Sequence, residues 1–216
     1  METEDLAGFR YIVVDESRGG LPPLLLLHKT GGDERELLPF AAAIAPGLPF
    51  IAVRGSVTED GKLRFFRRLS PGVFDEDDLR RRVHGLAGFI EAVVLRHGLR
   101  RPIAVGLSNG ANIALAMMMM HPRALCAAIL LRPAPPFGQS PAVELQGLPI
   151  LVVSGASDTI VPETDTVRLV NDLRERGAAV EIRSVEAGHR MTGADATAAR
   201  SWLSALHIPA MGDPAA

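Results

Sequence analysis

Short apolar runs alternate along the chain with longer segments in which apolar residues recur every three or four positions. The first pattern is typical of buried strands and the second of amphipathic helices. Strands are predicted at residues 11–14, 24–27, 50–53, 103–107, 125–131, 150–154 and 179–185. Helices are predicted at residues 34–45, 75–96, 111–120, 163–176 and 194–206. This alternation predicts an α/β fold, with a mostly parallel central sheet flanked by helices on both faces.

Two long stretches, 54–74 and 132–148, have neither pattern, and we expect them to build a binding pocket. The first is polar and turn-rich, with a hairpin signal at Glu59-Asp60-Gly61. The chain has no internal repeat and no linker composition, which predicts a single domain over residues 1–216 without a cap domain. The Pro/Gly/Ala-rich end, about 208–216, is expected to be a flexible tail.

Composition excludes several classes of protein. The 216 residues are 47% hydrophobic and 22% charged, so the chain is globular rather than disordered. A net charge of −2 gives no basic footprint for nucleic acid. The one cysteine, Cys126, excludes an internal disulfide and a cysteine-based metal cluster. An acidic start and the lack of an apolar run of about 18 residues predict a cytoplasmic protein that does not insert into membranes.

The first chemical signal lies where the strand 103–107 meets the following helix. Gly106-Leu107-Ser108-Asn109-Gly110 is a G-x-S-x-G motif in the strand–turn–helix context that a nucleophile elbow requires. Ser108 would project its hydroxyl above the sheet, and the two glycines remove side chains that would collide with the sharp turn. The alternative is an ordinary loop with two chance glycines.

A serine hydroxyl needs a base to become nucleophilic, and the base needs an orienting acid. Asp158 follows the strand 150–154, and His189 follows the strand 179–185. The order Ser108, Asp158, His189 is the order found in α/β-hydrolases. Asp158 has an alternative role as a turn or cap residue, with Glu163 and Asp165 as weaker candidates for the acid. The other histidines, at 28, 84, 97, 121 and 207, compete with His189 less well because of their positions.

The loop after the strand 24–27 reads His28-Lys29-Thr30-Gly31-Gly32-Asp33-Glu34. An oxyanion hole takes one N–H from the residue after the nucleophile and another from this loop. The N–H groups of Asn109 and Thr30 are therefore the candidate oxyanion donors. A plain glycine turn before a helix is the alternative interpretation of the loop, and the two are compatible.

These motifs together make the chain resemble the phospholipase/carboxylesterase family, which is related to acyl-protein thioesterases within the α/β-hydrolase superfamily. The resemblance runs from about Leu24 to Leu206. It implies a bacterial serine carboxylesterase that hydrolyses small or medium esters through Ser108, Asp158 and His189, without metal or cofactor. Dimers are common among such relatives, so a homodimer is also an expectation.

One residue departs from the family pattern, because Lys29 stands where the family usually has glycine. A positive φ there would strain a lysine by about 1–2 kcal/mol; alternatively, Lys29 favours an anionic substrate. Phe65 and Phe66, inside the basic segment 64–68, are further candidates to line the substrate pocket, with a place in the core as the alternative. Two other functions stay open: a thioesterase or lysophospholipase-type hydrolase with the same triad, and a catalytically impaired binding protein.

Overall fold

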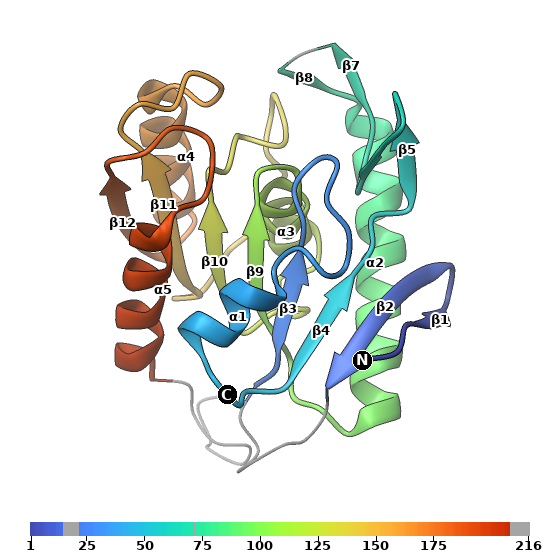
Figure 1. Ribbon diagram of the computed structural model, residues 1–216. Helices are drawn as coiled ribbons and strands as arrows, with labels where there is room; N and C mark the ends of the chain where they lie inside the picture. The colour runs from blue at the N-terminus through green and yellow to red at the C-terminus, as the bar shows by residue number, and fades with distance from the viewer. Residues whose placement is uncertain (15–21, 71, 208–216) are drawn as a thin grey trace.

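The computed structural model describes residues 1–14, 22–70 and 72–207, and its core is one sheet of eight strands (Figure 1). In spatial order the strands are β1 (Glu4–Leu6), β2 (Phe9–Val14), β4 (Phe50–Val53), β3 (Leu24–Leu27), β9 (Ile103–Leu107), β10 (Ala127–Leu131), β11 (Pro149–Gly155) and β12 (Ala179–Val185). All neighbours from β4 to β12 are parallel, whereas β1 and β2 form an antiparallel edge. The predicted α/β fold with a mostly parallel sheet is therefore confirmed, and the tail prediction at 208–216 lies outside the described residues.

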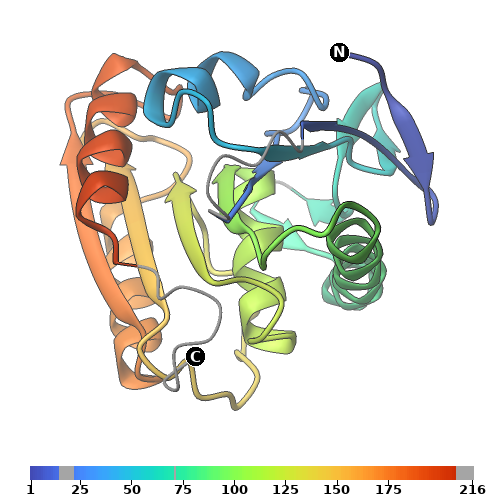
Figure 2. The ribbon, with the colours of Figure 1, turned by 90° about the horizontal axis from the view of Figure 1, so that it is seen from below.

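Helices cover both faces of the sheet, as Figures 1 and 2 show. On one face lie α1 (Leu38–Ile44) and α5 (Gly193–Ala205), which pack over a core that includes Leu26, Phe40 and Trp202. On the other lie α2 (Glu76–His97), α3 (Asn109–Met120) and α4 (Glu163–Glu175), over a larger core. The central strands β3, β9 and β10 are buried along their whole length, as expected for strands covered on both faces.

Local sequence explains where the long helices begin and end. Asp75 caps α2 by accepting a hydrogen bond from the Asp78 N–H at 3.0 Å, and Gly98 ends the helix with a left-handed φ of 61°. The structure corrects the predicted start of the first helix, because α1 begins at Leu38 rather than at residue 34. Pro39 lies in its first turn, where proline is tolerated, and Glu34 instead pairs with Arg54.

The stretch 54–74 forms two hairpins beside the carboxyl end of the sheet (Figure 1). The first pairs β5 (Val57–Glu59) with β6 (Lys62–Arg64) around the predicted turn, and the second pairs β7 (Arg68–Ser70) with β8 (Val73–Phe74). The carboxyl ends of β3, β9, β11 and β12 meet at this edge, where open α/β sheets carry their sites. No helix within the described ranges has both the length and the apolar character needed to cross a bilayer.

Candidate active site

Ser108 lies on a sharp turn between β9 and α3, with φ 51° and ψ −111°. A non-glycine residue with positive φ is uncommon and stores backbone strain. The flanking glycines make the turn sterically accessible. A Cβ on Gly106 would come within 2.5 Å of the Gly110 carbonyl oxygen, and a Cβ on Gly110 would overlap the Leu27 carbonyl. The strand, the turn and the helix can therefore approach only because these two positions lack side chains.

The structure brings together the three side chains predicted from sequence order. His189 Nε2 lies 2.9 Å from Ser108 Oγ, and His189 Nδ1 lies 2.8 Å from Asp158 Oδ2. A carboxylate can only accept, so Nδ1 carries the proton and Nε2 is free to accept from the serine hydroxyl. The Ser108 residue is partly exposed, whereas the Asp158 side chain is only 2% exposed. The predicted nucleophile is thus accessible to a ligand, whereas the side chain of the predicted acid is buried.

Asp158 is held ionised by hydrogen bonds. Burial raises its pKa, but the hydrogen bond with His189 and those from the N–H groups of Ile160 and Val161 outweigh burial and lower the pKa below its usual value. The bond to Ile160 N–H also makes Asp158 a turn residue, and this role is compatible with its contact with His189. Among the rival acids, Asp165 pairs with Arg168 at 3.5 Å on α4.

The backbone N–H groups of the loop after β3 differ in whether they have a hydrogen-bond partner among the described residues. The N–H of Lys29 donates to Glu36 Oε2 at 3.1 Å and that of Gly31 to the Leu63 carbonyl at 2.8 Å, whereas no hydrogen bond engages the Thr30 N–H. Asn109 is the first residue of α3, and N–H groups in a first helical turn have no partner within their helix. The two predicted oxyanion donors are therefore both left available.

Arg64 at the end of the first hairpin and the backbone of Phe65, which follows it, contact the side chains of these two residues. Arg64 donates from Nη1 to Thr30 Oγ1 at 3.0 Å, and the Phe65 N–H donates to Asn109 Oδ1 at 2.8 Å. Arg64 is buried rather than at the rim of the site, and its pKa is lowered by burial. Sequence reasoning missed this role because a hairpin alone does not reveal which loop it packs against.

His28 is a structural residue in this loop rather than a base. Its Nδ1 donates to the Lys29 carbonyl at 2.6 Å, and its Nε2 accepts from the Gly55 N–H at 2.8 Å. Burial lowers the pKa of His28, which favours the neutral ring that this pair of bonds requires. The rival histidines His84 and His121 bind each other, with Nδ1 of the first 2.8 Å from Nε2 of the second.

The three residues proposed to bind substrate differ in their surroundings. Phe65 and Phe66 are buried to 1% and 0% exposure within the core, so the structure corrects the expectation that they line an open pocket. Phe65 packs on the His28 ring and Phe66 on Phe74, which explains their burial. Lys29 is half exposed and forms an ion pair with Glu36. Lys29 is not among the described residues with positive φ, so its side chain causes no left-handed strain.

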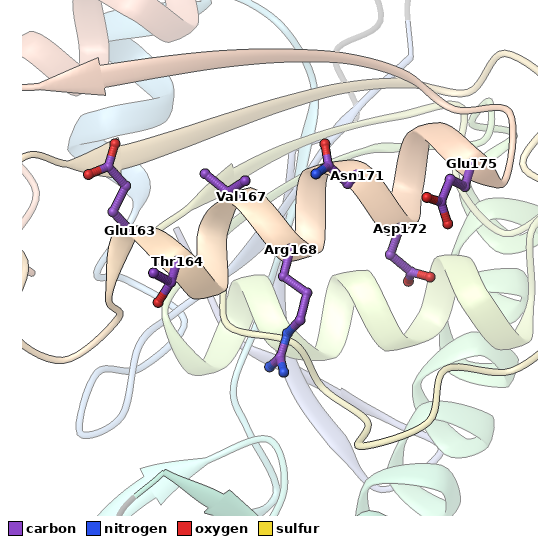
Figure 3. Close-up of a pocket in the computed structure, with 7 residues that line it drawn as sticks. All are labelled: Glu163, Thr164, Val167, Arg168, Asn171, Asp172 and Glu175. Atoms are coloured by element: carbon purple, nitrogen blue, oxygen red, sulfur yellow. The ribbon is translucent and has the colours of Figure 1, made fainter.

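The hollow drawn in Figure 3 is separate from these groups. All seven residues that line it, from Glu163 to Glu175, lie on the helix α4. It is therefore a surface along one helix and contains none of the three predicted catalytic side chains. No group of three or more potential metal ligands occurs among the residues that the structure describes.

Comparisons with known proteins agree with this architecture. A scan against protein-family models gives no match. The Putative hydrolase MhqD of Bacillus subtilis (strain 168) is 40% identical over 181 residues, which cover 83% of this chain and 90% of that protein. A Bacillus cereus carboxylesterase is 33% identical with a TM-score of 0.87, over 92% of this chain and 95% of the other. A Mesorhizobium loti carboxylesterase is 35% identical with the same TM-score, over 93% and 96% of the two chains. The chain therefore belongs to the phospholipase/carboxylesterase family of α/β-hydrolases.

Proposed function

We propose that this protein is a serine carboxylesterase that hydrolyses small or medium carboxylic esters through an acyl-enzyme on Ser108. The observation that carries the proposal is the continuous hydrogen-bonded chain from Ser108 Oγ through His189 to Asp158, with separations of 2.9 and 2.8 Å. These are the distances at which a base can take the proton of a nucleophile. The names of the two carboxylesterases that share the fold support the choice of an ester substrate.

The proposed reaction has two steps. Ser108 Oγ attacks the acyl carbon while His189 Nε2 takes the hydroxyl proton, and the protonated imidazole is stabilised by Asp158. The N–H groups of Thr30 and Asn109 stabilise the negative charge on the former carbonyl oxygen. His189 then gives its proton to the leaving alcohol. In the second step His189 takes a proton from water, the water attacks the acyl-enzyme, and His189 returns the proton to Ser108 Oγ as the acid is released.

The test combines a covalent probe with turnover of an activated ester. We expect a fluorophosphonate probe to label wild-type protein at Ser108, and p-nitrophenyl acetate to be hydrolysed. Ser108→Ala should lose labelling and lower turnover by a factor on the order of 10⁴ or more, because the nucleophile is gone. Wild-type protein that is neither labelled nor active would refute the proposal, and unchanged turnover in Ser108→Ala would place the nucleophile elsewhere.

Two alternatives are separated by the same assays. Comparing matched ester and thioester substrates, together with lysophospholipids, distinguishes a carboxylesterase from a thioesterase or a lysophospholipase. The hypothesis of an impaired binding protein rested on strain at Lys29, and the backbone of Lys29 lies outside the left-handed region. A labelled and active wild-type protein would exclude that hypothesis.

A further inference from the structure

A buried guanidinium lies behind the loop that carries His189. Arg132 directly follows β10, and its side chain is 0% exposed. We propose that Arg132 is a positioning residue that fixes the imidazole of His189 by binding the backbone on both sides of it. The inference rests on the proposed function, in which His189 is the base.

The contacts of Arg132 with the loop bracket His189. Its Nε donates to the Gly188 carbonyl at 2.9 Å, and its Nη2 donates to the Arg190 carbonyl at 3.4 Å. These carbonyls belong to the residues immediately before and after His189. With both neighbours bound to one rigid, planar group, the backbone at His189 has little freedom to shift or rotate.

The guanidinium is itself anchored to the sheet and to a helix. It forms a bidentate ion pair with Asp195 in the first turn of α5, with Nη1–Oδ1 at 2.5 Å and Nη2–Oδ2 at 3.2 Å. Nη1 also donates to the Val153 carbonyl on β11 at 3.3 Å. Asp195 is 0% exposed and accepts from the Thr192 N–H at 2.7 Å, so its charge is fully compensated. The loop is thereby connected to β11 and α5 through a single side chain.

Two backbone features show how closely this region is packed. Arg132 has a φ of 54°, which is rare for a residue other than glycine and lets its N–H donate to the Val153 carbonyl at 2.9 Å. Gly155 ends β11 beneath the loop, and a Cβ there would lie 2.5 Å from the Ala187 carbonyl oxygen and 3.0 Å from Arg132 Nε. The loop and the guanidinium therefore pack directly against the backbone of Gly155, where a side chain would not fit.

Stability alone does not account for these contacts. A buried ion pair is weak evidence for stability, because the cost of removing both charges from water offsets their attraction. The bonds to residues 188 and 190 instead act where the proposed mechanism needs precision. A displacement of about 1 Å in a reacting group can lower a rate by roughly 10²-fold.

The experiment uses two variants and a matched control. Arg132→Lys keeps a cation opposite Asp195, but one ammonium cannot span Asp195 and both carbonyls. The double variant Arg132→Met/Asp195→Leu removes both buried charges without leaving either unpaired. The control is the double variant Arg176→Met/Asp172→Leu at the C-terminal end of α4. Arg176 resembles Arg132 because it donates two hydrogen bonds to an aspartate, Asp172, and one to a backbone carbonyl, that of Pro141.

We expect both Arg132 variants to lower kcat for p-nitrophenyl acetate by about 10–100-fold, with KM within about twofold. The rate of fluorophosphonate labelling at Ser108 should fall in parallel. The control should keep wild-type kcat and labelling. A folded variant of Arg132 with wild-type kcat, or one in which only KM changes, would overturn the inference. If the double variant does not fold, Arg132→Lys decides alone; if Arg132→Lys also fails to fold, Arg132 is a folding residue and the inference is overturned.

The same assays separate this inference from the proposed function. Failure of the proposed function appears in wild-type protein, as absent labelling and absent turnover. Failure of the inference appears only in the variants, as labelling and kcat at the wild-type level in a wild-type enzyme that is active.

Discussion

The backbone strain at Ser108 allows a direct measurement of how much the proposed site lowers the free energy of unfolding. Its φ of 51° lies where glycine is tolerated and alanine is not. Such strain costs about 1–3 kcal/mol, whereas glycine ordinarily costs about 0.5–1 kcal/mol relative to alanine. We therefore expect Ser108→Gly to be more stable than Ser108→Ala by about 1 kcal/mol, measured as the free energy of unfolding in urea. Both variants lack the Ser108 hydroxyl, so they differ only in the backbone preference of residue 108. Equal free energies of unfolding in the two variants would argue against backbone strain at this position.

At the same scale, some functional residues can be predicted from the local sequence and others cannot. Ser108, Asp158 and His189 could be picked out because each follows a strand and each is part of a local motif. Arg132 could not, because its partner Asp195 lies 63 positions away and no local pattern connects them. Burial of Phe65 and Phe66 could not be predicted either, because they lie between two hairpins and local sequence does not show which side of such a segment faces the core.

At the scale of elements, the apolar pattern predicts the bounds of four strands and misses another strand altogether. The predicted strands 24–27, 50–53, 103–107 and 179–185 match β3, β4, β9 and β12 residue for residue. The apolar pattern does not predict β1, since Glu4-Asp5-Leu6 is short and acidic and is a strand only through pairing with β2. Whether these residues form a strand depends on pairing with a neighbouring strand, and the propensities of the three residues do not predict that pairing.

The close contact between α3 and the loop after β3 predicts that Gly110 cannot be replaced by a larger residue without loss of stability. A Cβ on Gly110 would overlap the Leu27 carbonyl and lie 2.6 Å from that of His28, so Gly110→Ala must push the turn at Ser108 away from the loop of Thr30. We expect it to lower the free energy of unfolding by about 1–3 kcal/mol and to reduce kcat. Gly88→Ala is the control, because Gly88 is exposed on α2 with open space around its Cα.

The control should respond in the opposite direction. Alanine favours a helix interior over glycine by about 0.8–1 kcal/mol, so Gly88→Ala should raise the free energy of unfolding with kcat unchanged. Chemical denaturation and p-nitrophenyl acetate turnover measure both quantities. A Gly110→Ala variant as stable and active as Gly88→Ala would show that the helix and the loop are not in the tight contact described.

Across the whole molecule, the parallel sheet explains how positions 108, 158 and 189 can meet. Each follows a strand whose carboxyl end lies at the same edge, and β9, β10, β11 and β12 are adjacent in that order. Sequence order and strand prediction are enough to place these side chains at one edge. They are not enough to give the hydrogen bonds of the surrounding loops, because those depend on hairpins and buried charges that come from other parts of the chain.

The whole fold should also lose stability in mild acid, through two histidines whose pKa is lowered. Burial lowers the pKa of His28 and of His121, and nearby His84 lowers that of His121 further. A histidine in the unfolded chain has a pKa near 6.5. Below that pH these two histidines are therefore protonated in the unfolded chain while they are still neutral in the folded chain. For the buried His28, stability is therefore full above about pH 6.5 and falls as pH drops toward 5, by up to about 1.4 kcal/mol per unit. The contribution of His121 is smaller, because its side chain is partly exposed and solvent screens it.

His28→Gln tests this dependence directly. Glutamine can still accept from the Gly55 N–H but does not titrate, so the variant should show a shallower slope of unfolding free energy against pH between about 6.5 and 5. His207→Gln, which removes an exposed histidine, is the matched control. The lowered pKa of Asp158 acts in a separate window, because its stabilisation is lost only as pH falls below about 4. Identical slopes in the two variants would mean that His28 takes up its proton in the fold as readily as in the unfolded chain.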